Sequence, residues 1–293
     1  MKVDFENMFD AASYKYIADN AVVQDLDSAD LNLILGAEDD AILVNRLNKD
    51  MPHVLIAGEA GSGKSIGTDL MLASLLSQHD ASELQMILVD YKQYEYRQFK
   101  CFRNATVVDS YETSDLIKPF KFLQQEINKR IALLHDHNAE TQDAYNKTVG
   151  KAEQLPLLLC VVADAAAVVS CFSPEDLAIY NSALQTISLT GSAVGVHLML
   201  TIQKPIKLAK DFTDRALPIA FQLQPDQYAR IFMDFKPNLK RSKGAVQTQA
   251  GNFIFQSVAI EYEYEDEEFF LNTTAKQMNS QSSDTEILFT FNK

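Results

Sequence analysis

Short apolar runs recur along the chain, and longer segments between them carry apolar residues every three or four positions. Five runs have the length of strands buried on both faces: residues 53–58, 84–92, 157–163, 196–205 and 217–223. The segments with helical spacing are residues 65–79, 114–147 (mostly beyond Pro119) and 174–195. Because strands alternate with helices, the pattern predicts an α/β fold with a mainly parallel sheet and helices on both faces.

The two ends of the chain follow other patterns. Residues 31–47 contain strand-like runs around a GAEDD turn, and residues 251–265 alternate as a C-terminal antiparallel edge strand does. We expect a lead-in with a possible helix at 1–30, a main domain at 31–260, and an acidic strand with a loosely attached polar tail and short final strand at 261–293. The acidic strip EYEYEDEEFF, residues 261–270, is typical of an exposed edge strand protected by charge; the alternative is a docking strip for a basic partner.

A glycine-rich turn follows the first of the five buried runs. Residues 58–65 read GEAGSGKS, which satisfies the phosphate-loop pattern G-x-x-x-x-G-K-[ST], with a strand before it and a helix after it. That context favours a real phosphate loop over a chance match, so we predict a site for ATP and Mg²⁺. Lys64 is expected to reach the β- and γ-phosphates, and the Ser65 hydroxyl to bind the metal. The predicted nucleotide-binding residues are Gly58, Gly61, Ser62, Gly63, Lys64, Ser65 and Ile66.

Hydrolysis needs acids near the phosphates, one to hold the metal's water shell and one to orient the attacking water. Asp164 is the one acid at the tip of the third buried run, so it is the candidate catalytic and metal-side residue. Asp90 ends the second run, and a structural or capping role is favoured for it. Gln203 ends the fourth run, where it either senses the γ-phosphate and positions water or only bonds to a loop.

Five segments, in order, resemble the motor domain of the FtsK/SpoIIIE DNA translocases. They are MPHVLIAGEAGSGKS, MILVDYKQYEY, EINKRIALL with DAYNK, LPLLLCVVADAAAVV, and GVHLMLTIQKP, all within residues 31–255. The resemblance implies a RecA-like phosphate-loop core, self-association into a hexameric ring, and ATP-driven movement of double-stranded DNA through the pore.

The sequence departs from the family at its second acidic motif, the Walker B strand. Counted from Leu155, the family's metal-side aspartate falls on Ala163 and its catalytic glutamate on Asp164. A slip of one residue would put the metal-side role on Asp164 and the glutamate position on Ala165. One acid is missing in either register, and an aspartate in place of glutamate is about one methylene short, a misplacement that costs on the order of a hundredfold in rate. The chain is therefore either a translocase motor or a catalytically impaired nucleotide-binding scaffold in a larger ring or type VII-like secretion assembly.

The family's trans-acting arginine is also in doubt. Pro218 stands near its place, so Arg215 or Arg230 would have to serve. Net charge is −14 at pH 7, which argues against a broadly basic surface for nucleic acid. One basic cluster in residues 235–244 could contact the DNA backbone, or it is a solvated loop. It contains Lys236, Lys240, Arg241 and Lys243.

The remaining composition bears on location and partners. The three cysteines, Cys101, Cys160 and Cys171, lack metal-ligand spacing and are typical of reduced cysteines in a cytosolic protein. No apolar stretch reaches the roughly 20 residues that a bilayer requires. We expect a cytoplasmic protein that associates with a membrane only through a membrane-bound or secretion-machine partner.

Overall fold

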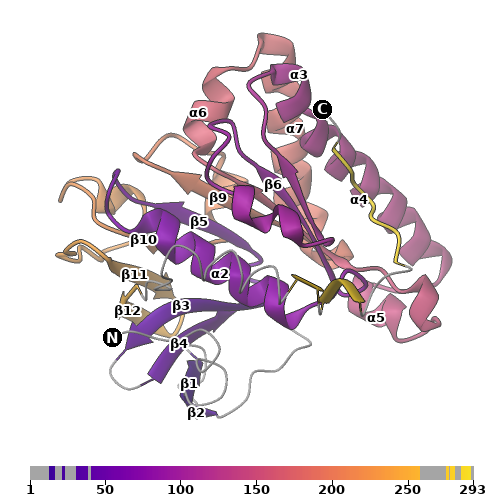
Figure 1. Cartoon of the computed structure of the whole chain (residues 1–293), viewed down its shortest axis with the longest axis horizontal. Coiled ribbons are helices and arrows are strands. Elements are labelled where there is room, and N and C mark those ends of the chain that lie inside the picture. The colour runs from indigo at the N-terminus through magenta and orange to yellow at the C-terminus, as the bar shows by residue number, and fades with distance from the viewer. Residues whose placement is uncertain are drawn as a thin grey trace.

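A sheet of twelve strands organises the part of the chain that the structure describes (Figure 1). The computed structural model describes residues 13–16, 22–23, 31–38, 41–257, 275–276, 278–280 and 285–291. The strand order is β2-β1-β4-β3-β12-β11-β10-β5-β9-β8-β6-β7. Six neighbouring strands are parallel: β10 (Ala216–Ala220), β5 (His53–Ala57), β9 (Val196–Ile202), β8 (Leu157–Val162), β6 (Leu84–Val89) and β7 (Ala105–Val108).

The five predicted buried strands are confirmed, and their burial explains their composition. β5, β6 and β9 are buried along their whole length, because helices cover both faces of the parallel part of the sheet. In such a sheet all carboxyl ends meet at one edge, which is where ligands bind in open α/β folds. The segments after β5, β8 and β9 therefore come together at that edge.

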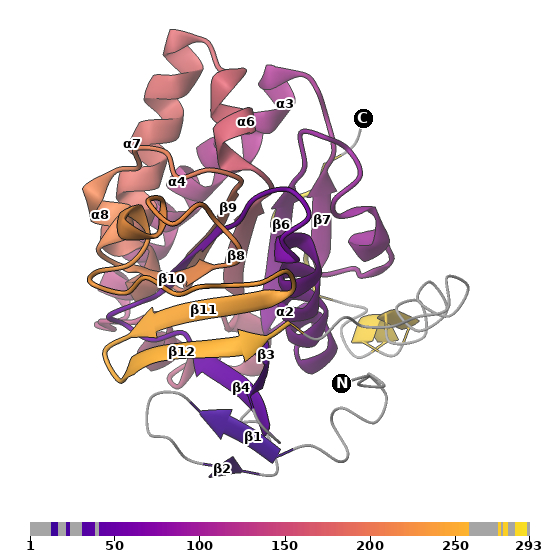
Figure 2. The ribbon, with the colours of Figure 1, turned by 90° about the vertical axis from the view of Figure 1, so that its left-hand side faces the viewer.

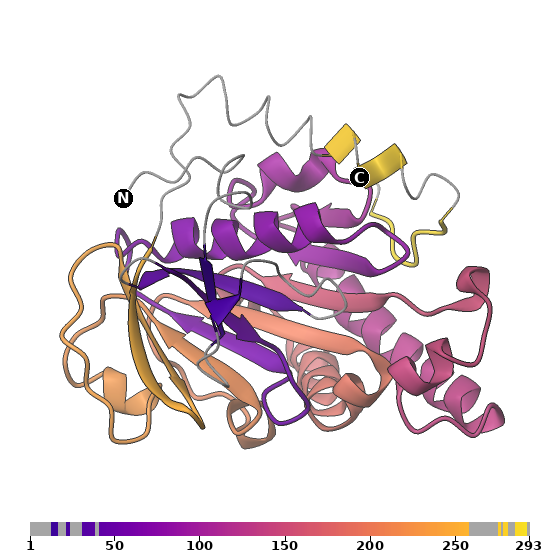
Figure 3. The ribbon, with the colours of Figure 1, turned by 90° about the horizontal axis from the view of Figure 1, so that it is seen from below.

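Helices cover the two faces of the sheet unequally (Figure 3). On one face α2 (Lys64–Gln78) packs with the large buried rings Phe99 and Phe102. On the other lie α3 (Thr113–Leu116), α4 (Lys118–Asp136), α5 (Gln142–Asn146), α6 (Ala165–Ser170), α7 (Pro174–Thr190) and α8 (Lys210–Thr213). The expected α/β fold with helices on both faces is thus confirmed. Within the described residues, no helix is both long and apolar enough to cross a bilayer.

The antiparallel part of the sheet pairs strands near the start of the chain with a hairpin that follows β10 (Figure 2). β11 (Lys243–Thr248) and β12 (Gly251–Gln256) form a hairpin, so the expected antiparallel pairing is confirmed. β12 is interior to the sheet, however, because β3 (Asn32–Glu38) pairs with it and β4 (Ala41–Arg46) continues the sheet. In residues 1–30 the described pieces are strands, β1 (Ser13–Tyr16) and β2 (Val22–Val23), where a helix seemed possible from the sequence. The acidic strip 261–270 lies outside the described residues.

The described end of the C-terminal tail is anchored, contrary to the expected loose attachment. Residues 285–291 run beside β6 and β7: Leu288 donates its N–H to Gln85 Oε1 at 2.9 Å, and Thr106 Oγ1 donates to the Phe289 carbonyl at 2.8 Å. The Phe289 ring also contacts Phe122 of α4, with centroids 5.1 Å apart. The described tail residues form no strand, because their hydrogen bonds to β6 and β7 involve side chains of those strands.

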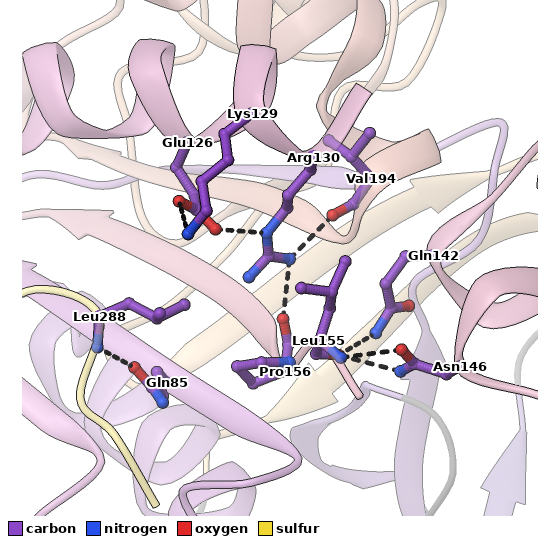
Figure 4. A network of polar contacts seen from close by, with 10 residues as sticks. All are labelled: Gln85, Glu126, Lys129, Arg130, Gln142, Asn146, Leu155, Pro156, Val194 and Leu288. Carbon is purple, nitrogen blue, oxygen red and sulfur yellow. Dashed lines mark hydrogen bonds and ion pairs between the residues drawn. The ribbon is translucent and has the colours of Figure 1, made fainter. Parts of the chain in front are cut away.

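A buried arginine fixes α4 to the amino-terminal ends of β8 and β9 (Figure 4). Arg130 Nε donates to Glu126 Oε1 at 2.9 Å, and Nη1 donates to the carbonyls of Pro156 and Val194 at 2.8 and 2.9 Å. Asn146 of α5 adds a reciprocal pair of bonds with the Leu155 backbone. The network therefore sets where β8 begins, at the end of the strand opposite the phosphate loop.

His53, the first residue of β5, is a buried histidine that we expect to make folding sensitive to acid. Its Nδ1 accepts the Leu198 N–H at 3.2 Å, and its ring stacks on Phe212 with centroids 6.0 Å apart. Burial, aided by the charges of His197 and Arg215, lowers the pKa of His53 to about 3. Since an unfolded histidine titrates near 6.5, the unfolded chain binds an extra proton between pH 6.5 and 3.

The free energy of unfolding should consequently fall as the pH falls through that window, by up to about 1.4 kcal/mol per pH unit from His53. We expect His53→Gln to flatten this dependence, as measured by urea unfolding at pH 6.5, 5.5 and 4.5. His135→Gln, at a side chain 89% exposed, is the matched control and should keep the wild-type slope. Equal slopes for His53→Gln and wild type would contradict the assignment.

Candidate nucleotide site

The phosphate loop lies between β5 and α2, as predicted. Gly61 and Gly63 adopt left-handed backbone conformations, with φ of 75° and 98°, which glycine enters without strain. The loop is attached to the neighbouring strands through backbone bonds: Gly58 N–H donates to the Ile202 carbonyl at 3.1 Å and Glu59 N–H to that of Gln222 at 3.0 Å. No acidic side chain occupies the first turn of α2, so its positive end is available to phosphate.

Close packing beneath the loop involves a glycine that the motif does not contain. A Cβ on Gly67 would lie 2.4 Å from the Phe221 ring, and one on Gly58 would lie 2.9 Å from Phe221 Cβ. The loop and α2 can therefore approach β10 only because both positions lack a side chain. Sequence reasoning missed Gly67, since a lone glycine in a helical pattern gives no sign of what it packs against.

Lys64 and Ser65 lie in a cavity of about 950 Å³ at the carboxyl edge of the sheet. Burial lowers the pKa of Lys64, and the negative charges of Glu95 and Asp164 offset part of that effect. A buried amine favours an anionic partner, which the phosphates of ATP supply. Ser65 and Ile66 are exposed, and they line the same cavity with Gly61, Gly63 and Lys64. The residues that line the cavity therefore fit a nucleoside triphosphate.

Asp90 shapes the loop after β6. Its carboxylate accepts backbone N–H groups from Gln93, Glu95 and Tyr96 at 3.0, 2.7 and 3.3 Å. Burial raises the pKa of Asp90 in spite of these three donors. The favoured structural role fits this geometry, because the carboxylate is fully engaged by its own loop and lies away from the cavity lining.

Asp164 forms an ion pair with Lys92. Asp164 Oδ2 lies 3.0 Å from Lys92 Nζ, and the two side chains are 13% and 24% exposed. Burial alone would lower the pKa of Lys92, but the hydrogen bond and charge of Asp164 outweigh it and raise that pKa. Asp164 has a left-handed φ of 49°, and its N–H donates to Thr201 Oγ1 at 2.9 Å. Among the residues that line the cavity, Asp164 is absent.

Ala163 lies between β8 and this ion pair. Its N–H still continues the ladder to the Val89 carbonyl at 2.9 Å. Its side chain belongs to the buried cluster on the α2 face, with Leu159 and Val161, whereas Ala165 belongs to the cluster on the opposite face. Position 163 therefore faces the helix that carries Lys64 and Ser65.

The cavity contains polar groups from other loops. Gln203, directly after β9, lines it as the sequence suggested, and no hydrogen bond or ion pair of its side chain to the described residues is found. Asp69, Glu95 and Arg97 also line it, and sequence reasoning had not assigned them a role. Glu95 follows the second strand in the segment DYKQYEY, which was the available signal. In the described ranges no three His, Cys, Asp or Glu side chains form a metal cluster. Ser65 as the protein ligand of Mg²⁺ in a nucleotide complex stays a prediction from the phosphate-loop motif.

The arginines considered for a trans-acting role differ in setting. Arg215 Nη2 donates to the Lys49 carbonyl at 3.1 Å and to Ser192 Oγ at 3.2 Å, at the amino-terminal start of β10. That is the sheet edge opposite the nucleotide cavity. Arg230 is exposed at the end of a short 3-10 helix, Tyr228–Arg230. Of the two, Arg230 has the exposed side chain.

The basic cluster is brought against the phosphate loop. Ser242 N–H donates to the Ser62 carbonyl at 3.0 Å, and Arg241 lines the nucleotide cavity. Lys236, Lys240 and Lys243 are exposed and do not line it. The structure thus separates Arg241 from the three lysines with which the sequence grouped it.

Known DNA translocases are similar in sequence to part of this chain. The DNA translocase FtsK of Helicobacter pylori is 27% identical over 159 residues, 54% of this chain and 18% of that protein. The DNA translocase SftA of Bacillus subtilis is 29% identical over 195 residues, 64% of this chain and 20% of that protein. The chain accordingly matches about a fifth of the length of these relatives.

Solved structures share the fold. The pCW3 conjugation coupling protein TcpA, in its monomer form with ATPgS, superposes with a TM-score of 0.71 at 22% identity, over 85% of this chain and 70% of that one. The cytoplasmic domain of the type VII secretion ATPase EccC of Thermomonospora curvata gives 0.70 at 19% identity, over 87% and 33%. Both likenesses support a RecA-like phosphate-loop fold. The profile of the FtsK/SpoIIIE family matches residues 17–214, well over half of the sequence, and the chain belongs to that family.

Proposed function

We propose that this chain binds MgATP at its phosphate loop and acts as the ATP-binding domain of a double-stranded DNA translocase, in DNA transfer or mobile-element maintenance. The observation that carries nucleotide binding is the cavity that joins the left-handed glycines, the buried Lys64 and the exposed Ser65. Lys64 would neutralise phosphate charge, the N–H groups at the start of α2 would bind phosphate oxygens, and Ser65 would hold Mg²⁺. Gln203 would contact the γ-phosphate or its attacking water.

The DNA-related part of the proposal rests on the family and on named relatives. FtsK and SftA are called DNA translocases, and TcpA a conjugation coupling protein. The domain would work by self-association into a ring, hexameric in the family resemblance, with double-stranded DNA in the pore. Lys236, Lys240 and Lys243 are the exposed cations proposed to face the DNA backbone.

A second function, a nucleotide-binding scaffold within a larger ring or secretion machine, is favoured by the ion pair at the tip of β8. Asp164 is bound to Lys92 and Ala163 carries no acid, so the described strand tip offers no free carboxylate to activate water. EccC, one of the proteins that share this fold, is a type VII secretion ATPase. In the scaffold, ATP would hold the domain in its assembled form and turn over slowly or not at all.

Steady-state ATP turnover with and without double-stranded DNA, measured beside MgATP affinity, separates the two functions. We expect wild type to bind MgATP and Lys64→Ala to lose at least about tenfold in affinity, since a charged contact contributes 1.5–3 kcal/mol. Lys151→Ala, at an exposed lysine far along the chain, is the control and should bind as wild type. Turnover that DNA stimulates and Lys64→Ala abolishes supports the translocase. Tight binding without turnover, alone or with DNA, supports the scaffold.

A further inference from the structure

Arg241 belongs to a loop that is fixed directly over the phosphate loop. Besides the bond from Ser242 N–H to the Ser62 carbonyl, the Ser242 carbonyl accepts the Ser257 N–H and Gln256 Nε2, each at 2.8 Å. Ser242 has a left-handed φ of 61°, and a Cβ on Gly63 would lie 3.0 Å from Ser242 Cα. The position of residue 242, and with it the backbone of its neighbour, is thus set by the β11–β12 hairpin on one side and the phosphate loop on the other.

The side chain of Arg241 is available to a ligand in the nucleotide cavity. It lines the cavity that contains Gly61, Lys64 and Gln203, and it is exposed. No hydrogen bond or ion pair joins its guanidinium to the described residues. Guanidinium groups bind phosphate oxygens in a bidentate manner, through two charge-assisted N–H···O bonds.

We propose that Arg241 binds the phosphate chain of a nucleoside triphosphate held in the phosphate loop of its own chain. The inference rests on the proposed nucleotide site and assigns to that site a further cation beside Lys64 and Arg97, supplied by the segment before β11. It divides the basic cluster into one nucleotide contact, Arg241, and three lysines that remain at the surface. Because Ser242 bonds to the loop and to β12, nucleotide bound to Arg241 would also fix the hairpin to the phosphate loop.

The test compares nucleotide affinities of Arg241→Gln and of the flanking controls Lys240→Gln and Lys243→Gln, without DNA. Equilibrium dialysis with ATP, ADP and AMP gives the dissociation constants, in the presence of Mg²⁺. We expect Arg241→Gln to weaken ATP binding about tenfold, as a charge-assisted hydrogen bond at an exposed position does, and to weaken AMP binding less than twofold. The two lysine variants should bind all three nucleotides within twofold of wild type.

The other possible outcomes reject either the Arg241 contact or the nucleotide site itself. Unchanged ATP affinity in Arg241→Gln, with wild type binding ATP in a Lys64-dependent manner, overturns the assignment and leaves the proposed nucleotide site intact. Equal weakening for ATP and AMP overturns contact with the phosphate chain, because AMP lacks the β- and γ-phosphates. Equal weakening in all three variants overturns it as well, since it reports only the net charge of the loop. Failure of wild type to bind ATP rejects the nucleotide site itself. Thermal unfolding of each variant without nucleotide verifies that all are folded.

Discussion

The double substitution Ala163→Asp with Asp164→Glu is expected to raise steady-state ATP turnover about a hundredfold over wild type. Position 163 faces the α2 side of the sheet, where Lys64 and Ser65 begin the helix, so an aspartate there can reach the metal's water shell. A glutamate at 164 restores the missing methylene, and correct placement of an activating group is worth on the order of a hundredfold. Turnover in the presence of MgATP, with and without double-stranded DNA, is the measurement.

Four further variants test the register behind this expectation. Either single substitution should gain far less than the pair, because the two carboxylates have separate tasks. Ala165→Glu, the restoration that the slipped register would require, places a carboxylate in the buried cluster on the opposite face and should lower the thermal unfolding midpoint without raising turnover. Lys64→Ala in the double variant should abolish the gain. A folded double variant that binds MgATP and turns over no faster than wild type would reject Ala163 as the metal-side position.

The ion pair between Lys92 and Asp164 engages the one acid at the tip of β8. Lys92 follows β6 and Asp164 follows β8, which are hydrogen-bonded neighbours in the sheet. Asp90 holds the loop that carries Lys92 and Glu95, so both side chains are positioned by one buried carboxylate. Glu95 remains in the nucleotide cavity while Lys92 turns to Asp164. The loop after β6 therefore influences both the charge in the cavity and the state of the remaining acid.

Features determined by local sequence could be predicted, and features determined by distant pairing could not. β5, β8 and β9 are short apolar runs next to a recognisable motif or strand-end residue, and each is found where expected. β7 is four residues, ATVV, between polar segments, too short to stand out. The interior place of β12 depends on β3, which precedes it by more than two hundred residues.

The candidate site shows the same division. The phosphate loop and Gln203 were predicted because motif and strand end are local signals, and both line the cavity. Lys92 could not be identified as the partner of Asp164 from the sequence, because that contact depends on β6 and β8 being neighbours in the sheet. Apolar runs do not reveal the order of strands. The position of Arg241 at the cavity could not be predicted either, because it depends on the contact between Ser242 and Ser62, which lie far apart in the sequence. From charge alone the arginine was grouped with its lysine neighbours.

Arg130→Met is expected to lower the free energy of unfolding by about 3–5 kcal/mol, the usual cost of leaving one member of a buried ion pair alone. Arg130 is fully buried and Glu126 is 5% exposed, so the carboxylate would lose its buried partner and keep only the longer contact to the exposed Lys129. The carbonyls of Pro156 and Val194 would lose their donor at the start of β8 and β9. Urea unfolding at pH 7 measures the change, and methionine keeps most of the side-chain volume, so a cavity contributes little.

Lys129→Met is the matched control, because Lys129 directly precedes Arg130 in α4 and contacts the same Glu126 carboxylate. Its Nζ lies 3.5 Å from Glu126 Oε2, but its side chain is 67% exposed, and exposed pairs contribute less than about 1 kcal/mol. The double variant Glu126→Leu with Arg130→Met should recover much of the loss, since replacing both members of a buried pair by apolar groups is often neutral. Equal losses for Arg130→Met and Lys129→Met would show that Arg130 acts only as a surface charge. A double variant as unstable as Arg130→Met would place the cost in the two carbonyls, and the anchoring of β8 would then depend on them and not on the ion pair.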